Sequence, residues 1–308
     1  YRLLNKFHMT HRNSSDRGFE ISSLVNLEKR PHSLSVSPNL FPDIIPGNML
    51  YQHVDFRNIS IENRAGLLSV FKLGNFTLHP SAIVNYHHNS LESRLDATDN
   101  DLTLDYLDAG VGAEVMFSTR KIHASLYLPV KYRLFRLNNR LDGNITDKNR
   151  FRVEPSLNFT YKFNSSHNLK AAAMLNYMTP SIETLYSGHI LTSYRQLSAY
   201  DVAGLYEGIN QHYSLGYDFK NILSMSFAGA EVSWNRQSPK VLYGSCYDGI
   251  VQRTISRRTS ENGDMISAKI HASQGFDWRR LKIGASVTYS YYDSPLLVQD
   301  EVLRYSGN

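Results

Sequence analysis

Hydrophobic and polar residues alternate with a period of two along most of this chain. In residues 121–135, one set of alternate positions is apolar: Ile122, Ala124, Leu126, Leu128, Val130, Tyr132 and Leu134. The positions between them include Lys121, His123, Ser125, Lys131 and Arg133. Since successive side chains of a strand point to opposite faces, this pattern predicts a strand with one apolar and one polar face. The predicted strand is about twice as long as an ordinary globular strand.

The same pattern predicts about twelve strands, joined by links of two alternating kinds. The predicted strands lie near residues 2–11, 18–29, 50–72, 75–88, 105–118, 121–136, 150–163, 168–178, 211–219, 222–235, 264–276 and 280–292. Short links are expected at 13–17, 74, 119–120, 164–167, 220–221 and 278–279, and long links at 30–49, 89–104, 137–149, 179–210, 236–263 and after 293. Antiparallel outer-membrane barrels have short periplasmic turns and long outer loops. We therefore expect an all-β fold, an antiparallel up-and-down transmembrane β-barrel, with residues 1–308 forming one barrel region.

Two further patterns refine this expectation. Apolar alternate positions in 107–117, 151–163 and 283–291 are predicted to face lipid, with polar residues between them facing a water-filled lumen. Aromatic residues gather near both ends of the strands, which indicates two interfacial belts, although aromatics also simply favour strands. Since proline removes a ladder hydrogen bond, bulges or shifted boundaries are expected at Pro80, Pro129 and Pro155.

Composition narrows the class of protein. Hydrophobic residues make up 42% of the chain and the mean hydropathy is −0.37. No apolar run approaches the ~18 residues of a transmembrane helix, which excludes a helical membrane protein. A soluble β-sandwich has a similar hydrophobic content and mean hydropathy, so strand length and aromatic placement must decide between a sandwich and a membrane barrel. The single cysteine, Cys246, excludes an intrachain disulfide, and the net charge of +5 is scattered, which argues against nucleic acid as a partner.

The stretch 168–236 resembles the barrels of TonB-dependent receptors of Bacteroidetes-type bacteria. The similarity lies in the segment NLKAAAMLNYMTPSIETLYSGHILTSYRQL and in the hairpin HYSLGYDFKNILSMSFAGAEVSW. Its motif-like part is residues 178–186, where a strand ends in a Pro-Ser element, Pro180 and Ser181. The arginine that often precedes this element in the family is Met178 or Thr179 here.

The resemblance implies a fragment of about twelve strands from a larger, ~22-stranded barrel. It also implies a bacterial outer-membrane location and uptake of a nutrient of the siderophore, glycan or peptide class. The expected partners are outer-membrane lipid, the TonB complex acting through a plug domain outside this sequence, and a surface lipoprotein. The plug and the terminal strand of the barrel are not recognised within residues 1–308, and both ends of the chain read as cut.

Two groups of residues are candidates for binding. The loop 179–210 carries aromatic rings and a guanidinium suited to a ligand at the outer mouth, namely Tyr186, Tyr194, Arg195, Tyr200 and Tyr206. Alternatively, these tyrosines pack on the barrel rim. The acidic string in the predicted loop 89–104 offers oxygen ligands for Ca²⁺, namely Asp96, Asp99, Asp101 and Asp105, or it is simply a solvated loop.

We expect no enzymatic activity and no other cofactor, because no nucleophile motif of the GxSxG type occurs. The rival hypothesis is a non-membrane all-β adhesin or interaction module, and a less favoured one is an outer-membrane barrel enzyme. In the adhesin, the apolar faces of two sheets would pack against each other. In the barrel, the same faces point outward into lipid.

Overall fold

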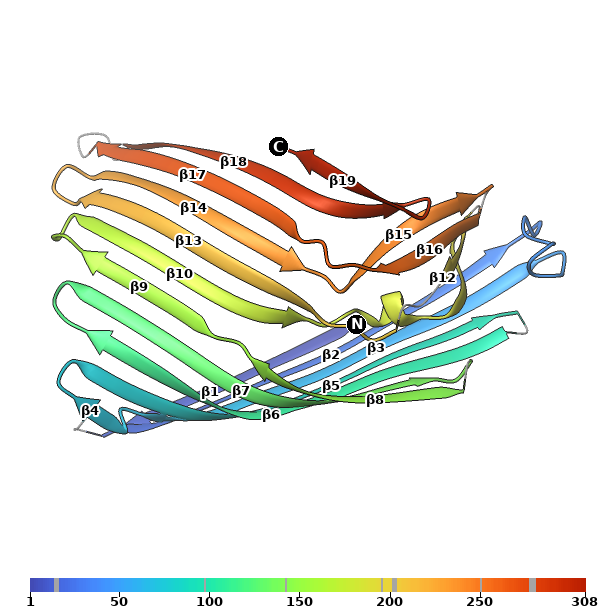
Figure 1. The fold of residues 1–308 in the computed structure, drawn as a ribbon, viewed down its shortest axis with the longest axis horizontal. Helices are drawn as coiled ribbons and strands as arrows, with labels where there is room; N and C mark the ends of the chain where they lie inside the picture. Colours follow the sequence, from blue (N-terminus) through green and yellow to red (C-terminus); the bar gives the residue numbers. More distant parts are fainter. Residues whose placement is uncertain are drawn as a thin grey trace.

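The computed structural model describes residues 1–13, 17–96, 98–141, 143–194, 196–200, 204–249, 251–276 and 281–308. Within this part of the chain, the strands join into one 19-stranded sheet. Figure 1 shows it as a strongly curved, open wall with tight turns at one end and longer excursions at the other. No ladder among the described residues joins β1 at one edge to β18 near the other edge. None of the described helices is long and apolar enough to cross a membrane.

The wall consists of long antiparallel strands that pair with their neighbours in chain order. They are β1 (Arg2–Arg12), β2 (Gly18–Val36), β3 (Leu50–Leu68), β5 (Phe76–Leu95), β6 (Thr98–Ser118), β7 (Ile122–Asn139), β8 (Asn144–Val153), β9 (Ser156–Lys162), β10 (His167–Met178), β13 (Gly208–Asn221), β14 (Ser226–Ser238), β17 (Gly263–Phe276) and β18 (Leu281–Val298). Because β8 and β9 pair in turn with β7, they act as one wall strand. Each of the twelve predicted strands is thus confirmed.

The prolines account for the break between β8 and β9. The ladder of β7 pairs Val130 with Val153 and resumes at Tyr127 with Ser156. The interruption holds both prolines, since Pro129 lies across from Glu154 and Pro155 across from Leu128. At Pro80 the ladder is irregular too: β3 pairs with β5 up to Ser81, and the short strand β4 (Phe71–Leu73) takes over at Leu78. The expected irregularities are confirmed at these positions.

The apolar face of the wall points away from protein. On β7, Leu126, Leu128, Val130, Tyr132 and Leu134 are exposed, whereas Arg133 between them is buried. Val111 on β6 and Phe151 on β8 are 65% and 71% exposed. We call this apolar side the outer face and the opposite side the inner face. Since the apolar faces do not pack against each other, the sandwich arrangement of the rival adhesin is wrong for this chain.

The long-loop end of the molecule was predicted less well. Strands β2, β5 and β6 extend well beyond their predicted ends, so the expected loop 89–104 is almost entirely strand. The expected loops 179–210 and 236–263 contain additional elements: η1 (Ile182–Leu185), β11 (Gly188–Ser193), β12 (Gln196–Tyr200), β15 (Val241–Asp248) and β16 (Val251–Arg258). Likewise, the tail after 293 continues β18 and adds β19 (Glu301–Gly307).

These additional elements form a second layer at this end. β12 pairs in parallel with β16, and β15 pairs in parallel with the end of β18. The layer therefore links loops that are far apart in sequence. Figure 1 shows β12, β15 and β16 together at the end opposite the short turns.

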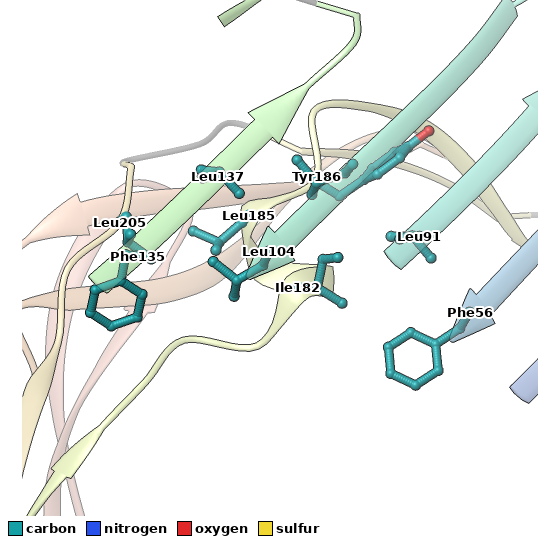
Figure 2. Packing of buried hydrophobic residues seen from close by; sticks show 10 residues of the cluster. Phe56, Leu91, Leu104, Phe135, Leu137, Ile182, Leu185, Tyr186 and Leu205 are labelled. Carbon is teal, nitrogen blue, oxygen red and sulfur yellow. The ribbon is translucent and has the colours of Figure 1, made fainter. Parts of the chain in front are cut away.

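The segment 179–207, which joins β10 to β13, folds onto the inner face; we call it the inner loop. Figure 2 shows Ile182, Leu185, Tyr186 and Leu205 of this loop near side chains of β3, β5, β6 and β7. The wall side of this buried cluster is Phe56, Leu91, Leu102, Leu104, Phe135 and Leu137. A second cluster joins Leu191 and Leu197 to Val36, Phe41, Leu50 and Leu95. The core of the molecule thus lies between one half of the wall and the inner loop.

Candidate functional site: a buried charge network beneath the inner loop

Arg133 on the inner face of β7 is at the centre of a buried polar network. Its guanidinium makes a bidentate ion pair with the carboxylate of Asp108, the residue directly opposite it on β6. The ring of Tyr106 lies 4.3 Å from the guanidinium carbon of Arg133. Because the side chains of Arg133 and Asp108 are only 6% and 3% exposed, they depend on this pairing for their stability inside the protein.

Arg133 also holds both ends of the inner loop. Its Nη1 donates to Oγ1 of Thr179 at 2.7 Å and to Oε1 of Glu207 at 3.3 Å. Thr179 is the first residue of the inner loop and Glu207 is the last. One wall side chain therefore contacts the two points at which the loop leaves β10 and enters β13.

A second buried arginine extends the network along β8. Arg152 lies 3.7 Å from Asp108, 3.5 Å from Glu207 and 3.2 Å from Glu154, measured between nitrogen and carboxylate oxygen. Lys131 pairs with Glu154 at 2.6 Å. The nitrogen Nε of Arg152 and Oε2 of Glu207 have no hydrogen-bond partner among the described residues. Arg150, which is half exposed, lies 3.6 Å from the same Oε2 of Glu207. The network is thus incomplete in hydrogen bonds, which makes it costly to bury.

Uncharged side chains of the wall hold the middle of the inner loop. Gln52 of β3 is fully buried and pairs with the backbone of Leu191: its Nε2 donates to the carbonyl at 2.9 Å, and its Oε1 accepts from the amide at 2.6 Å. Nδ2 of Asn100 donates to the carbonyl of Ser187 at 2.7 Å. These contacts satisfy loop backbone groups that would otherwise be buried without partners.

The hairpin β15–β16 of the second layer lies against the inner loop. Tyr206 lies between two cations, with Nζ of Lys148 and Cζ of Arg258 each 4.6 Å from its ring centre. Its hydroxyl accepts a hydrogen bond from Arg258 of β16. Burial raises the pKa of Tyr243 in β15, and a hydrogen bond with Thr184 of η1 opposes that rise. Hairpin β15–β16 therefore packs directly on the inner loop.

Three of the tyrosines predicted to bind a ligand have described side chains, and these three lie in different surroundings. Tyr186 is 2% exposed and belongs to the apolar cluster, so its ring packs against the wall, in agreement with the alternative interpretation. Tyr194 is 55% exposed at the turn between β11 and β12, and Tyr206 is held by cations as described above. Tyr200 lies in β12. Arg195 lies outside the described residues. Ligand contact by this group stays a prediction.

The aspartates predicted to bind Ca²⁺ are distributed along strands. Asp96 lies at the end of β5, and Asp99, Asp101 and Asp105 follow one another on the outer face of β6. Nε of Arg94 donates to Asp99 at 2.9 Å, and Asp105 accepts from the hydroxyl of Tyr86 at 2.9 Å. Within the described part of the chain, no three His, Cys, Asp or Glu side chains are arranged to hold a metal ion. Calcium binding at this position stays a prediction, tested by Ca²⁺ titration.

Sequence reasoning did not select the charge network as a site. It placed Asp108 and Arg133 on the polar side of their strands, and this placement is confirmed. The missing signal was the hairpin register: with a tight turn at 119–121, Asp108 and Arg133 lie directly opposite each other. Glu207 and Gln52 had no such signal, because their partners are 74 and 139 residues away in the chain.

Comparisons with known proteins agree with this architecture. No family model matches the chain, and no curated protein matches it. A solved structure of the copper transporter OprC superimposes with a TM-score of 0.66 at 12% identity, over 94% of this chain and 46% of that one. The unliganded ferric citrate transporter FecA gives 0.58 at 13% identity, over 95% of this chain and 42% of that one.

A third structure is similar to the same extent. The ferric-catecholate import receptor Fiu of E. coli K12, in its closed form, gives a TM-score of 0.58 at 9% identity, over 94% of this chain and 47% of that one. The chain thus spans about half the length of these structures. It has the fold of a TonB-dependent receptor barrel, as the resemblance in its sequence implied.

Proposed function

We propose that this chain forms part of the wall of an outer-membrane, TonB-dependent receptor for nutrient uptake. The observation that carries the proposal is the sidedness of the wall: apolar side chains are exposed on the outer face while charged ones are buried on the inner face. In a bilayer, this arrangement removes the apolar side chains from water and keeps the charged ones away from lipid. The nutrient belongs to the siderophore, glycan or peptide class.

The inner loop has a specific part in this proposal: because it folds onto the inner face, it narrows the lumen at the long-loop end. The named functions of OprC, FecA and Fiu, all metal or metal-chelate carriers, support the siderophore class among the three. Energy coupling would reach the wall through a plug domain and the TonB complex.

Fractionation of the source bacterium tests the membrane part of the proposal. The native protein is expected to sediment with the outer membrane and to change electrophoretic mobility on heating, as folded barrels do. Recovery in the soluble periplasmic or cytosolic pool would contradict it. The transport part is tested by uptake of ferric citrate and a ferric catecholate in a deletion strain and its complemented partner. Uptake should require both the gene and the proton gradient across the inner membrane.

A further inference from the structure

The outer face carries a polar cavity near the long-loop end of the wall. Its volume is about 490 Å³, within the range of sites for small ligands. Two side chains from each of β3, β5 and β6 line it, namely Tyr51, His53, Glu92, Arg94, Asp99 and Asp101. Arg140, which directly follows β7, lines it as well. We call this space the outer cavity.

The strand register places the outer cavity beyond the apolar part of the outer face. Tyr86, Leu107 and Leu134 lie side by side on β5, β6 and β7 and form the last row of aromatic and apolar side chains there. From this row to the long-loop end, every outer side chain of β5 and β6 is polar or charged. Glu92 is six residues beyond Tyr86, about 20 Å along the strand. In a bilayer, the outer cavity would therefore lie above the hydrocarbon.

The wall separates the outer cavity from the lumen. Along the same three strands, the residues that point inward at this level are Gln52, Ser93 and Asn100, and all three are buried. Gln52 and Asn100 are bonded to the inner loop, which covers them. A ligand in the outer cavity is therefore a molecule beside the wall and not a nutrient inside the barrel.

The charges of the outer cavity are mixed. Three carboxylates, those of Glu92, Asp99 and Asp101, line it together with the guanidinium groups of Arg94 and Arg140. The carboxylates would repel an anion such as phosphate. Within the described residues, no three His, Cys, Asp or Glu side chains are arranged to hold a metal ion. A neutral ligand rich in hydroxyl groups suits both charges, because a hydroxyl donates to a carboxylate and accepts from a guanidinium.

Several groups of the outer cavity have bonding capacity left for such a ligand. Arg140 is exposed, and no ion pair of the described residues includes it. Oδ1 of Asp101 has no hydrogen-bond partner in the described part of the chain, so this carboxylate is short of a donor. Tyr51 is 47% exposed, and its ring combines an apolar face with a polar end. An apolar ring face beside hydrogen-bonding groups matches a sugar ring, which has C–H groups on its faces and hydroxyls at its edge.

We propose that the outer cavity binds a carbohydrate. The ring of Tyr51 packs against one face of a sugar, Arg140 donates to its oxygens, and the carboxylates accept from its hydroxyls. The sugar belongs either to a glycolipid that stands beside the wall in the outer leaflet or to a free oligosaccharide. The inference goes beyond the proposed function, because the site lies outside the lumen, and it rests on that function only for the presence of a bilayer around the wall.

Calorimetric titration of the folded native protein tests the inference, in a detergent without a sugar headgroup. One probe is the oligosaccharide released from the outer-membrane glycolipid of the source bacterium, and the other is maltohexaose. Saturable binding is expected with a Kd of about 1 mM or lower. Binding of the released oligosaccharide assigns the site to a glycolipid, and binding of maltohexaose alone assigns it to a free saccharide. No binding of either probe at about 10 mM overturns the inference.

Variants show whether the sugar occupies the outer cavity. Arg140→Gln should weaken binding about tenfold, because it removes a charged hydrogen-bond donor. Tyr51→Leu should weaken it at least about twofold through the loss of ring packing. The matched variants Arg136→Gln and Tyr247→Leu change exposed side chains that do not line the outer cavity and should keep the Kd within about twofold.

The possible failures are distinguishable. Unchanged affinity in both Arg140→Gln and Tyr51→Leu overturns the inference, because the sugar then binds elsewhere. Both positions are exposed, and if one variant does not fold, the other decides alone. A wild type that binds the sugar through these residues but is recovered in the soluble pool overturns the proposed function and leaves the carbohydrate site standing.

Discussion

The two halves of the wall have the same alternating pattern but differ in what covers their inner faces. On β7, exposed and buried residues alternate strictly from Tyr132 to Asn139. On β18, every residue from Leu281 to Tyr289 is exposed, so neither face is covered. The difference comes from the inner loop, which packs on β3, β5, β6 and β7. Alternation alone therefore shows which face is polar, and only the loop decides whether that face is buried.

The same difference in burial changes how much an ion pair contributes to the free energy of unfolding. Lys170 and Asp218 pair at 2.5 Å on the uncovered half, with side chains 60% and 36% exposed. Arg133 and Asp108 pair beneath the inner loop, with side chains 6% and 3% exposed. Water screens the first pair, and losing one partner leaves the other hydrated. In the second pair, losing one partner leaves an uncompensated charge in the interior.

The largest effect is expected from Arg133→Met. The substitution leaves Asp108 and Glu207 buried without their main partner, so it should lower the free energy of unfolding by about 3–5 kcal/mol. Denaturation of the folded protein in detergent measures this loss. The matched variant Lys170→Met in the uncovered half should cost no more than about 1 kcal/mol. Equal losses in the two variants would show that the inner loop does not exclude water from the network.

The second expected effect concerns packing on the two faces of one strand. Leu137 of β7 is 8% exposed and packs in the cluster beneath the inner loop, whereas Leu134 is 41% exposed on the outer face. Leu137→Ala should cost about 2–5 kcal/mol, because it leaves a cavity between wall and loop. Leu134→Ala opens no cavity and should change stability by about 0.5 kcal/mol. A larger loss for Leu134 would mean that the outer face is covered by protein.

The wall could be predicted from the sequence because its signals are local. Period-two alternation and short turns are both readable within a hairpin, and they predicted every wall strand. Several strand ends at the long-loop side were wrong, as in β2, where the prediction ended at residue 29 and the strand continues to Val36, whereas the ends predicted at residues 50 and 178 are confirmed. Residues 29–32 are Lys, Arg, Pro and His, so the alternation of hydrophobicity is interrupted there while the backbone ladder continues to Val36.

The second layer and the inner loop could not be predicted because their partners are distant. β12 pairs with β16 across more than fifty residues, and the contact of Gln52 with Leu191 spans 139 residues. Neither segment has a periodic pattern that selects its partner. One part of the site could therefore be predicted, because the hairpin register places Asp108 opposite Arg133. The contact of Glu207 with Arg133 could not be predicted, because it depends on how the inner loop folds.

A smaller effect is expected where the inner loop is held by hydrogen bonds alone. Gln52→Leu removes both bonds to the backbone of Leu191 and leaves its buried amide and carbonyl unpaired, at a cost of about 1–3 kcal/mol. The Leu191 amide should then exchange its hydrogen about five- to a hundredfold faster. Gln237→Leu makes the same chemical change at an exposed position of β14 and should leave that amide unaffected. An unchanged hydrogen-exchange rate in Gln52→Leu would mean that the apolar clusters alone hold the inner loop against the wall.

The smallest effect on the free energy of unfolding is expected from Arg94→Gln, which removes an exposed ion pair and can be compared with the buried pair of Arg133. Arg94 pairs with Asp99 at 2.9 Å, but the two side chains are 66% and 56% exposed. The pair gains little Coulomb energy in water and orders two flexible side chains, so its loss should cost only about 0.2–1 kcal/mol. Adding 1 M NaCl to the wild type should remove the same small amount, because salt screens exposed charges. The loss in Arg133→Met should persist in that salt, since ions do not enter the space beneath the inner loop. If salt reduced both losses alike, the network beneath the inner loop would have to be open to solvent.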